Sequence, residues 1–203
     1  RRPRELSGHL QLRRGVYVPV QSWRALAPWD RYLARVHAVA AIRPGSVFCL
    51  ESAAALHGLP VFGEPRNVHV FDPAAARSTS FGDIVVHTSQ TPRTVGRLDH
   101  LDVVDSADTV VDLARVLPPA FALATVDAAI ASGHPAPVAL ETIVDRLSGR
   151  AIGGRGTRRA RWAIERADAR AESVGESVSR AVIDWLGYPP PALQHMFRFE
   201  GSE

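Results

Sequence analysis

Residues 101–119, LDVVDSADTVVDLARVLPP, pass from a strand pattern to a helix pattern within one short stretch. Residues 101–105 are rich in β-branched side chains, which predicts a strand. Ser106 then stands where a helix N-cap is expected, and Asp108 places an acidic side chain in the first turn. The apolar face of this helix consists of Val110, Leu113, Ala114 and Leu117, which follow helical spacing. The Pro-Pro pair at 118–119 ends it, so a sheet gives way to helices at this point of the chain.

Similar patterns lie on both sides of this stretch. Upstream, residues 67–72 and 83–88 are two further β-branched runs, separated by a turn region at 73–82. Downstream, the apolar spacing predicts helices at about 120–132, 137–148 and 157–168. The sequence therefore predicts an α+β fold, with a small antiparallel or mixed sheet followed by a helical second half.

The N-terminal part predicts a hairpin and two helices. Leu10 and Leu12 alternate with polar residues, Arg13-Arg14-Gly15 makes a tight connection, and Val16-Tyr17-Val18 returns as a strand. One helix is expected to begin after Pro28 and to end at 43–45. A shorter helix is expected at 51–57, with Gly58 as its C-cap.

The C-terminal part predicts one more helix and one strand. A helix is expected at about 174–185, because five apolar residues follow helical spacing there, and Gly187 caps it. Residues 193–199 predict a strand that runs toward Glu203. Since a helix and a single strand do not form a stable unit, we expect a second domain that is truncated at this end.

Composition excludes several classes of protein. Apolar residues make up 46% of the 203 residues, and no apolar run approaches the roughly 18 residues of a membrane span. We therefore expect no membrane partner. The single cysteine, Cys49, can form neither an internal disulfide nor a cysteine-based metal cluster, which favours the cytoplasm. All 24 basic residues are arginine, so no P-loop lysine or Schiff-base lysine exists, and ATPases and pyridoxal enzymes are excluded.

The charge is unevenly distributed along the chain. The net charge of +3 combines +4 over residues 1–20, +5 over residues 150–170 and −6 over the rest. This pattern predicts either nucleic-acid contact through the basic segments or a basic face combined with an acidic partner face. A solvated, arginine-rich surface is the alternative. The candidate nucleic-acid-binding residues are Arg13, Arg14, Arg155, Arg158, Arg159 and Arg161.

Local motifs for catalysis are weak. The eight histidines lack the spacing of metal ligands, so no metal site is predicted, and no Gly-x-Ser-x-Gly elbow occurs. The glycine-rich stretch 153–159 runs into a helix with Thr157 placed to cap it, and it is either a phosphate-binding loop or a flexible linker. Glu176 either pairs with Arg180 one helical turn later or belongs to a metal-dependent active site.

Several segments together resemble a known family. They are Leu12-Arg13-Arg14-Gly15-Val16-Tyr17-Val18-Pro19, Glu51-Ser52-Ala53-Ala54-Ala55-Leu56-His57-Gly58-Leu59, Asp108-Thr109-Val110-Val111-Asp112-Leu113-Ala114-Arg115 and Val126-Asp127-Ala128-Ala129. In this order they resemble the AbiEi-like antitoxin proteins of actinobacteria, over roughly residues 10–170. The segment from Glu172 to His195 is similar to the start of a very-short-patch-repair endonuclease-like domain of the DUF559 type.

The resemblance implies three parts and a function. Residues 1–20 would be the remnant of a winged helix-turn-helix with the hairpin as its wing. Residues 21–170 would be the antitoxin domain, and residues 171–203 the truncated start of a restriction-endonuclease-like domain. The implied function is an antitoxin-type, DNA-associated regulator in a toxin-antitoxin or phage-defence system. Its implied partners are DNA and a cognate nucleotidyltransferase-like toxin.

The resemblance also implies an alternative function, a metal-dependent DNA endonuclease. Glu176 would then belong to an incomplete catalytic site that needs Mg²⁺ and further carboxylates beyond Glu203. For residues 1–203 alone we expect no bound cofactor and no nuclease activity, because a single carboxylate cannot surround the ion.

Overall fold

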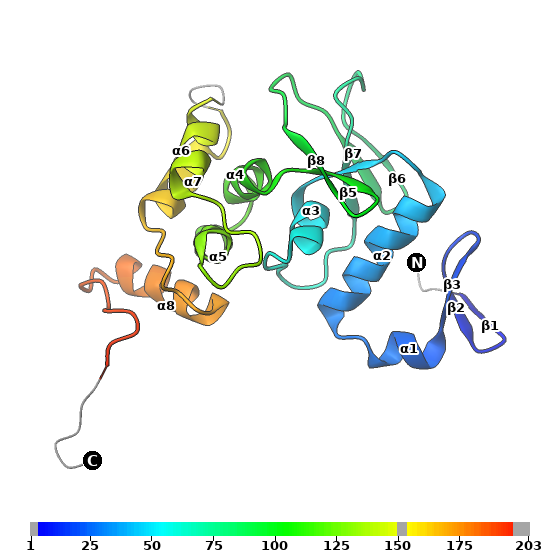
Figure 1. The fold of residues 1–203 in the computed structure, drawn as a ribbon, viewed down its shortest axis with the longest axis horizontal. Coiled ribbons are helices and arrows are strands. Elements are labelled where there is room, and N and C mark those ends of the chain that lie inside the picture. Colours follow the sequence, from blue (N-terminus) through cyan, green and yellow to red (C-terminus); the bar gives the residue numbers. More distant parts are fainter. Residues whose placement is uncertain (1–3, 150–153, 197–203) are drawn as a thin grey trace, which may run out of the picture.

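A mixed six-stranded sheet and a layer of helices form the body of the molecule, and a small three-stranded sheet lies beside them (Figure 1). The computed structural model describes residues 4–149 and 154–196. The predicted α+β fold is confirmed, with the sheet strands in the first half of the chain and the long helical layer in the second half.

The N-terminal sheet is antiparallel, in the order β1-β2-β3. Its strands are β1 (Arg4–Leu6), β2 (His9–Arg13) and β3 (Val16–Pro19). The predicted hairpin is confirmed, and Arg13 pairs with Val16, so the tight connection consists of Arg14 and Gly15. β1 was not predicted, because three residues are too short to show an alternating pattern.

The six-stranded sheet has the order β6-β7-β5-β4-β9-β8. Its strands are β4 (Val47–Phe48), β5 (Val68–Phe71), β6 (Thr79–Phe81), β7 (Ile84–His87), β8 (Val95–Leu98) and β9 (Leu101–Val104). β5 pairs with β7, and β4 with β9, in parallel, while the other neighbours are antiparallel. The three predicted strands are confirmed as β5, β7 and β9. β6 lies inside the predicted turn region, and it and β8 are exposed edge strands without buried residues.

Eight helices are present in the described ranges. They are α1 (Val20–Ala25), α2 (Pro28–Ile42), α3 (Leu50–His57), α4 (Ser106–Val116), α5 (Pro119–Ile130), α6 (Leu140–Ser148), α7 (Thr157–Glu165) and α8 (Val174–Trp185). All the predicted helices are confirmed, with boundaries that differ by up to three residues. None of the eight is long and apolar enough to cross a membrane.

Two predicted caps are wrong by one residue. The N-cap of α4 is Asp105 rather than Ser106, and its carboxylate accepts a hydrogen bond from the Asp108 amide at 2.8 Å. The N-cap of α7 is Gly156 rather than Thr157, whose hydroxyl instead donates to the Gly154 carbonyl at 2.8 Å. In both cases the chain enters the helix one residue earlier than the pattern of capping side chains predicts.

The core consists of two main apolar clusters with α3 between them. One cluster joins the sheet to α2 and contains Tyr32, Val36 and Phe48. The other lies among α4 to α8 and contains Leu113, Leu123 and Ile143. In α3, Ala53 belongs to the first cluster and Ala54 to the second, and both are fully buried. The small side chains of α3 therefore let both clusters pack closely against one helix.

The last helix is held to the helical layer by a buried carboxylate. Asp127 of α5 is 1% exposed and accepts hydrogen bonds from the Ser177 hydroxyl at 2.6 Å, Arg180 Nη1 at 2.8 Å and the Asp168 amide at 2.8 Å. Burial raises the pKa of Asp127, while these three donors act to lower it. Arg180 thus pairs with Asp127, so the predicted ion pair with Glu176 is wrong.

The strand predicted at residues 193–199 is wrong for the residues that the structure describes. Residues 193–196 include a turn in which Gln194 has φ +54°, and they form no strand. Residues 197–199, the remainder of the predicted strand, lie outside the described residues. Since α8 packs closely against α5, this helix is supported by the helical layer and needs no strand of its own.

Because α7 approaches α4 closely, we expect substitutions at two glycines to have unequal effects on stability. Gly156 and Gly15 have similar φ values, +80° and +81°, but a Cβ at Gly156 would overlap the Arg115 carbonyl, whereas a Cβ at Gly15 meets no atom within 4 Å. We expect Gly156→Ala to lower the free energy of unfolding by at least about 3 kcal/mol, because steric overlap adds to backbone strain. Gly15→Ala should cost about 1 kcal/mol. Equal losses in urea denaturation would contradict the close approach.

The Asp127 network predicts that this carboxylate is essential for stability. Asp127→Ala leaves the largely buried Arg180 charge without its partner, so we expect a loss of about 3–5 kcal/mol in chemical denaturation. Asp184→Ala is the matched control, because Asp184 forms an ion pair of 3.0 Å with Arg166 in which both side chains are about two-fifths exposed. That substitution should cost less than about 1 kcal/mol. A loss at Asp127 no larger than at Asp184 would disprove the structural role.

Candidate anion-binding site

The six candidate arginines lie in two separate places. Arg13 and Arg14 belong to the N-terminal hairpin, while Arg155, Arg158, Arg159 and Arg161 lie at the start of α7. The hairpin and α7 are at opposite ends of the molecule (Figure 1). The fold therefore does not bring the two groups into one surface patch, although the four arginines at α7 remain together.

Arg13 is engaged in a contact within the protein. Its Nη2 donates to Asp83 Oδ2 at 2.8 Å, its Nη1 bonds the other carboxylate oxygen, and Arg35 approaches the same carboxylate at 3.2 Å. Burial alone would raise the pKa of Asp83, but the hydrogen bonds and charges of the two arginines lower it below its ordinary value. This contact fastens the hairpin to the turn before β7. Binding of a phosphate by Arg13 remains a prediction that requires exchange of this partner.

The four arginines at the start of α7 have exposed side chains. Arg159 Nη1 donates to the carbonyls of Val116 and Leu117 at 2.9 Å, and Arg115 Nε donates to the Arg155 carbonyl at 3.1 Å. These bonds satisfy carbonyl groups at the end of α4 and fix the start of α7 above it. Gly156 permits the close approach of the two backbones.

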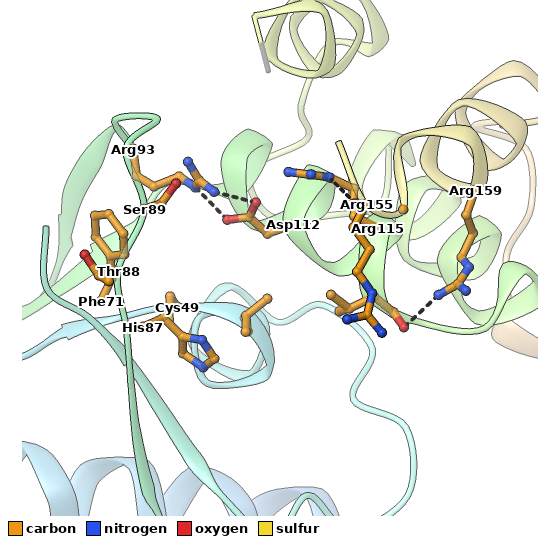
Figure 2. A pocket seen from close by; sticks show the side chains of 13 residues that line it. Cys49, Phe71, His87, Thr88, Ser89, Arg93, Asp112, Arg115, Arg155 and Arg159 are labelled. Carbon is orange, nitrogen blue, oxygen red and sulfur yellow. Dashed lines mark hydrogen bonds and ion pairs between the residues drawn. The ribbon is translucent and has the colours of Figure 1, made fainter. Parts of the chain in front are cut away.

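A cavity of about 450 Å³ lies between this junction and the sheet (Figure 2). Phe71, His87 and Thr88 line it from the sheet side, and Arg115, Arg155 and Arg159 line it from the helical side. Cys49 and Leu50, at the start of α3, complete the wall beside Phe71. A cavity of this size is typical of small-molecule sites.

The cavity has an excess of positive charge. Arg93 and Asp112 form a bidentate ion pair of 2.7 and 2.9 Å along one wall, with side chains only 8% and 14% exposed, so their charges cancel. Among the described residues that line the cavity, the remaining charged groups are Arg115, Arg155 and Arg159. Three guanidinium groups and no unpaired carboxylate favour an anionic ligand, and phosphate matches their planar geometry.

A chain of titratable groups reaches the cavity from the sheet. His69 Nδ1 lies 2.8 Å from His87 Nε2, and His69 Nε2 lies 3.5 Å from Glu51 Oε2, an electrostatic contact rather than a short hydrogen bond. Burial lowers the pKa of both histidines and raises the pKa of Glu51. Both imidazoles are therefore neutral at pH 7. Burial also raises the pKa of the Cys49 thiol far above its ordinary value, so Cys49 is not an activated nucleophile.

Glu176 has a capping role at the start of α8. The Ser173 hydroxyl accepts from the Glu176 amide at 3.2 Å, and Glu176 Oε2 accepts from the Glu172 amide at 2.8 Å. Ser173 and Glu176 have the S-x-x-E spacing of a capping box, with the Glu176 carboxylate bonded to the amide one residue before the N-cap. Within residues 4–149 and 154–196, no three His, Cys, Asp or Glu side chains are grouped so that they could hold a metal ion. The catalytic role implied for Glu176 remains a prediction.

Sequence patterns alone did not find His87, Arg115 and the ion pair of Arg93 with Asp112. His69 and His87 are 18 residues apart and meet only because β5 and β7 pair in parallel, with Phe71 opposite His87. No sequence spacing encodes this register. Arg115 occurs in the resembling segment Asp108–Arg115, but its place beside α7 depends on the turn at Gly156.

Comparison with known proteins identifies relatives whose names assign no function. Two proteins of Mycobacterium tuberculosis, "Uncharacterized protein MT2308" from strain CDC 1551 / Oshkosh and "Uncharacterized protein Rv2248" from strain ATCC 25618 / H37Rv, are each 36% identical over 161 residues. The match covers 78% of this chain, which spans about half, 56%, of the length of each relative. No family model matches the chain, and no solved structure matches it.

The contact of Arg13 with Asp83 predicts a pH-dependent contribution to stability. The pKa of Asp83 is lowered in the folded state, so its stabilisation is present above the unfolded value of about 3.8 and is lost as the pH falls through the folded value. We expect Asp83→Asn to lower the free energy of unfolding at pH 6, and the difference from wild type to shrink as the pH falls below the unfolded pKa of about 3.8. A difference that is unchanged between these pH values would contradict the ion-pair contribution.

Proposed function

We propose that this chain is an antitoxin-type, DNA-associated regulator that holds the DNA backbone through the start of α7. The observation that carries the proposal is the group of exposed arginines, Arg155, Arg158, Arg159 and Arg161, beside a cavity with an excess of positive charge. The resemblance to AbiEi-like antitoxins supports the same function. The two M. tuberculosis relatives support the actinobacterial context of that resemblance.

The start of α7 favours phosphate binding in two ways. The helix has no acidic residue in its first turn, so no carboxylate repels an approaching phosphate. The positive end of the helix dipole lies at the same place as the arginine side chains. Guanidinium groups bind phosphate oxygens bidentately, and several such contacts together give affinity without base recognition. The proposed binding is therefore strong at low salt and shows little sequence preference.

The proposed antitoxin role also requires a surface for the toxin. Outside its two basic segments the sequence carries a net charge of −6, which would complement a basic, nucleotidyltransferase-like toxin. A complex held only by exposed charges dissociates as salt screens them. Co-purification that survives about 0.5 M NaCl therefore supports specific docking, and loss of the toxin at this salt concentration would argue against it.

Salt-dependent DNA binding tests the proposal. If the four arginines at α7 neutralise phosphates of a duplex without terminal phosphates, the logarithm of the association constant should fall with log salt at a slope of about −4. Replacing Arg158 and Arg161 by Gln should weaken binding and reduce the steepness of this slope by about 2. The control replaces Arg77 and Arg97 by Gln, because both are exposed and lie on the sheet side of the molecule.

Two results would overturn the proposal. One is the absence of duplex binding at low salt. The other is an equal effect of the two double variants, which would assign the affinity to general positive charge instead of to α7. Fluorescence anisotropy with a labelled duplex, titrated at several NaCl concentrations, provides both measurements.

A further inference from the structure

The cavity beside α7 has two chemically different ends. The guanidinium groups of Arg115, Arg155 and Arg159 line its helical side, and the imidazole of His87 lines its sheet side (Figure 2). The helical side suits an anion. Of the four arginines proposed to hold the DNA backbone, Arg158 and Arg161 do not line the cavity, whereas Arg155 and Arg159 line it together with Arg115.

The sheet side offers a hydrogen-bond acceptor. The Glu51 carboxylate near His69 Nε2 favours the tautomer with the His69 proton on Nε2, and in that tautomer His69 Nδ1 accepts a hydrogen bond from His87 Nε2. His87 Nδ1 is then left with a lone pair, and within the described residues no protein group donates to it. The charged or titratable groups that act on His87 are His69 from β5, Glu51 from α3 and Asp112 from α4, and Arg93 donates hydrogen bonds to Asp112.

The cavity also has apolar surface. Phe71, Leu50 and Val116 line it together with polar residues, which are Thr88, Ser89 and the ion pair of Arg93 with Asp112. A matching ligand therefore has a phosphate at one end, an apolar or aromatic middle part, and a hydroxyl or amino donor that can reach His87. An inorganic anion satisfies only the first of these three features. A nucleoside carrying a terminal phosphate has all three.

We infer that this cavity binds a phosphomonoester of mononucleotide size, with the phosphate on Arg115, Arg155 and Arg159 and a nucleoside donor group on His87 Nδ1. Two sources can supply this chemistry, a free nucleoside monophosphate or the phosphorylated end of a DNA strand. The second source rests on the proposed DNA association, since the arginines of α7 would hold the strand whose end enters the cavity.

Isothermal titration calorimetry with adenosine monophosphate and with inorganic phosphate tests the inference. We expect Arg115→Gln to weaken both probes about tenfold or more, because each loses a charge-assisted contact. His87→Leu should weaken only the nucleotide, about fivefold or more, because inorganic phosphate does not reach this side. Arg97→Gln, a control at an exposed arginine of β8 outside the cavity, should leave both affinities within about twofold.

Arg115 is half-buried and bonded to Arg155, so Arg115→Gln can lower affinity by disturbing the fold. A second variant therefore separates loss of the contact from loss of the fold. Arg155→Gln changes an exposed side chain at the same end of the cavity and should weaken both probes while the melting temperature stays the same. The source of the ligand is distinguished with two single-stranded oligonucleotides that differ only in a 5′-phosphate. If the protein prefers the phosphorylated strand and Arg115→Gln abolishes this preference, the ligand is the end of a DNA strand. If the protein binds the mononucleotide and shows no such preference, the ligand is a free nucleotide.

Two outcomes overturn the inference. The first is the absence of saturable binding of either phosphomonoester by the wild-type chain. The second is nucleotide affinity that is unchanged in both Arg115→Gln and Arg155→Gln. Binding of unphosphorylated duplex that depends on Arg158 and Arg161 would persist in these cases, so the failure of this inference is distinguishable from failure of the proposed function.

Discussion

The carboxylate of Asp127 is the contact on which the arrangement of the helical half depends. Its three donors come from the hydroxyl of Ser177, the guanidinium of Arg180 and the backbone of Asp168, so one buried charge binds α5, α8 and the segment after α7. A buried carboxylate is tolerable only when its oxygens are satisfied in this way. Each donor therefore has a fixed place, and the helices that carry them have one relative orientation.

That orientation in turn determines where α7 can begin. The helix starts directly above the end of α4, because Gly156 lets the two backbones touch and Arg159 bonds the terminal carbonyls of α4. Arg115 and Arg155 meet at the same junction. The positive side of the cavity is thus a consequence of helix packing. Its histidine side comes from the sheet, where the pairing of β5 with β7 brings His69 and His87 together.

The elements could be predicted from local patterns, and the site could not. Apolar spacing predicted α4, and β-branched runs predicted β5, β7 and β9, because burial of one face leaves a periodic signal. β6 and β8 are exposed edge strands and leave no such signal. Arg180 was assigned to Glu176, its neighbour in the helix, because sequence spacing shows partners within one element only. The contacts of Arg180 with Asp127 and of Arg13 with Asp83 join residues 53 and 70 positions apart.

The position of α3 gives the two apolar clusters a common support. Ala53 and Ala54 are consecutive and face opposite clusters, so a displacement of α3 toward one cluster opens a gap in the other. The cavity is lined by the start of this helix, by Phe71 and His87 of the sheet, and by arginines of the helical layer. A molecule that fills it would contact both the sheet and the helical layer, and would therefore oppose their separation. With the cavity filled, the sheet and the helices would unfold in one cooperative transition. With the cavity empty, they would unfold in two separate steps.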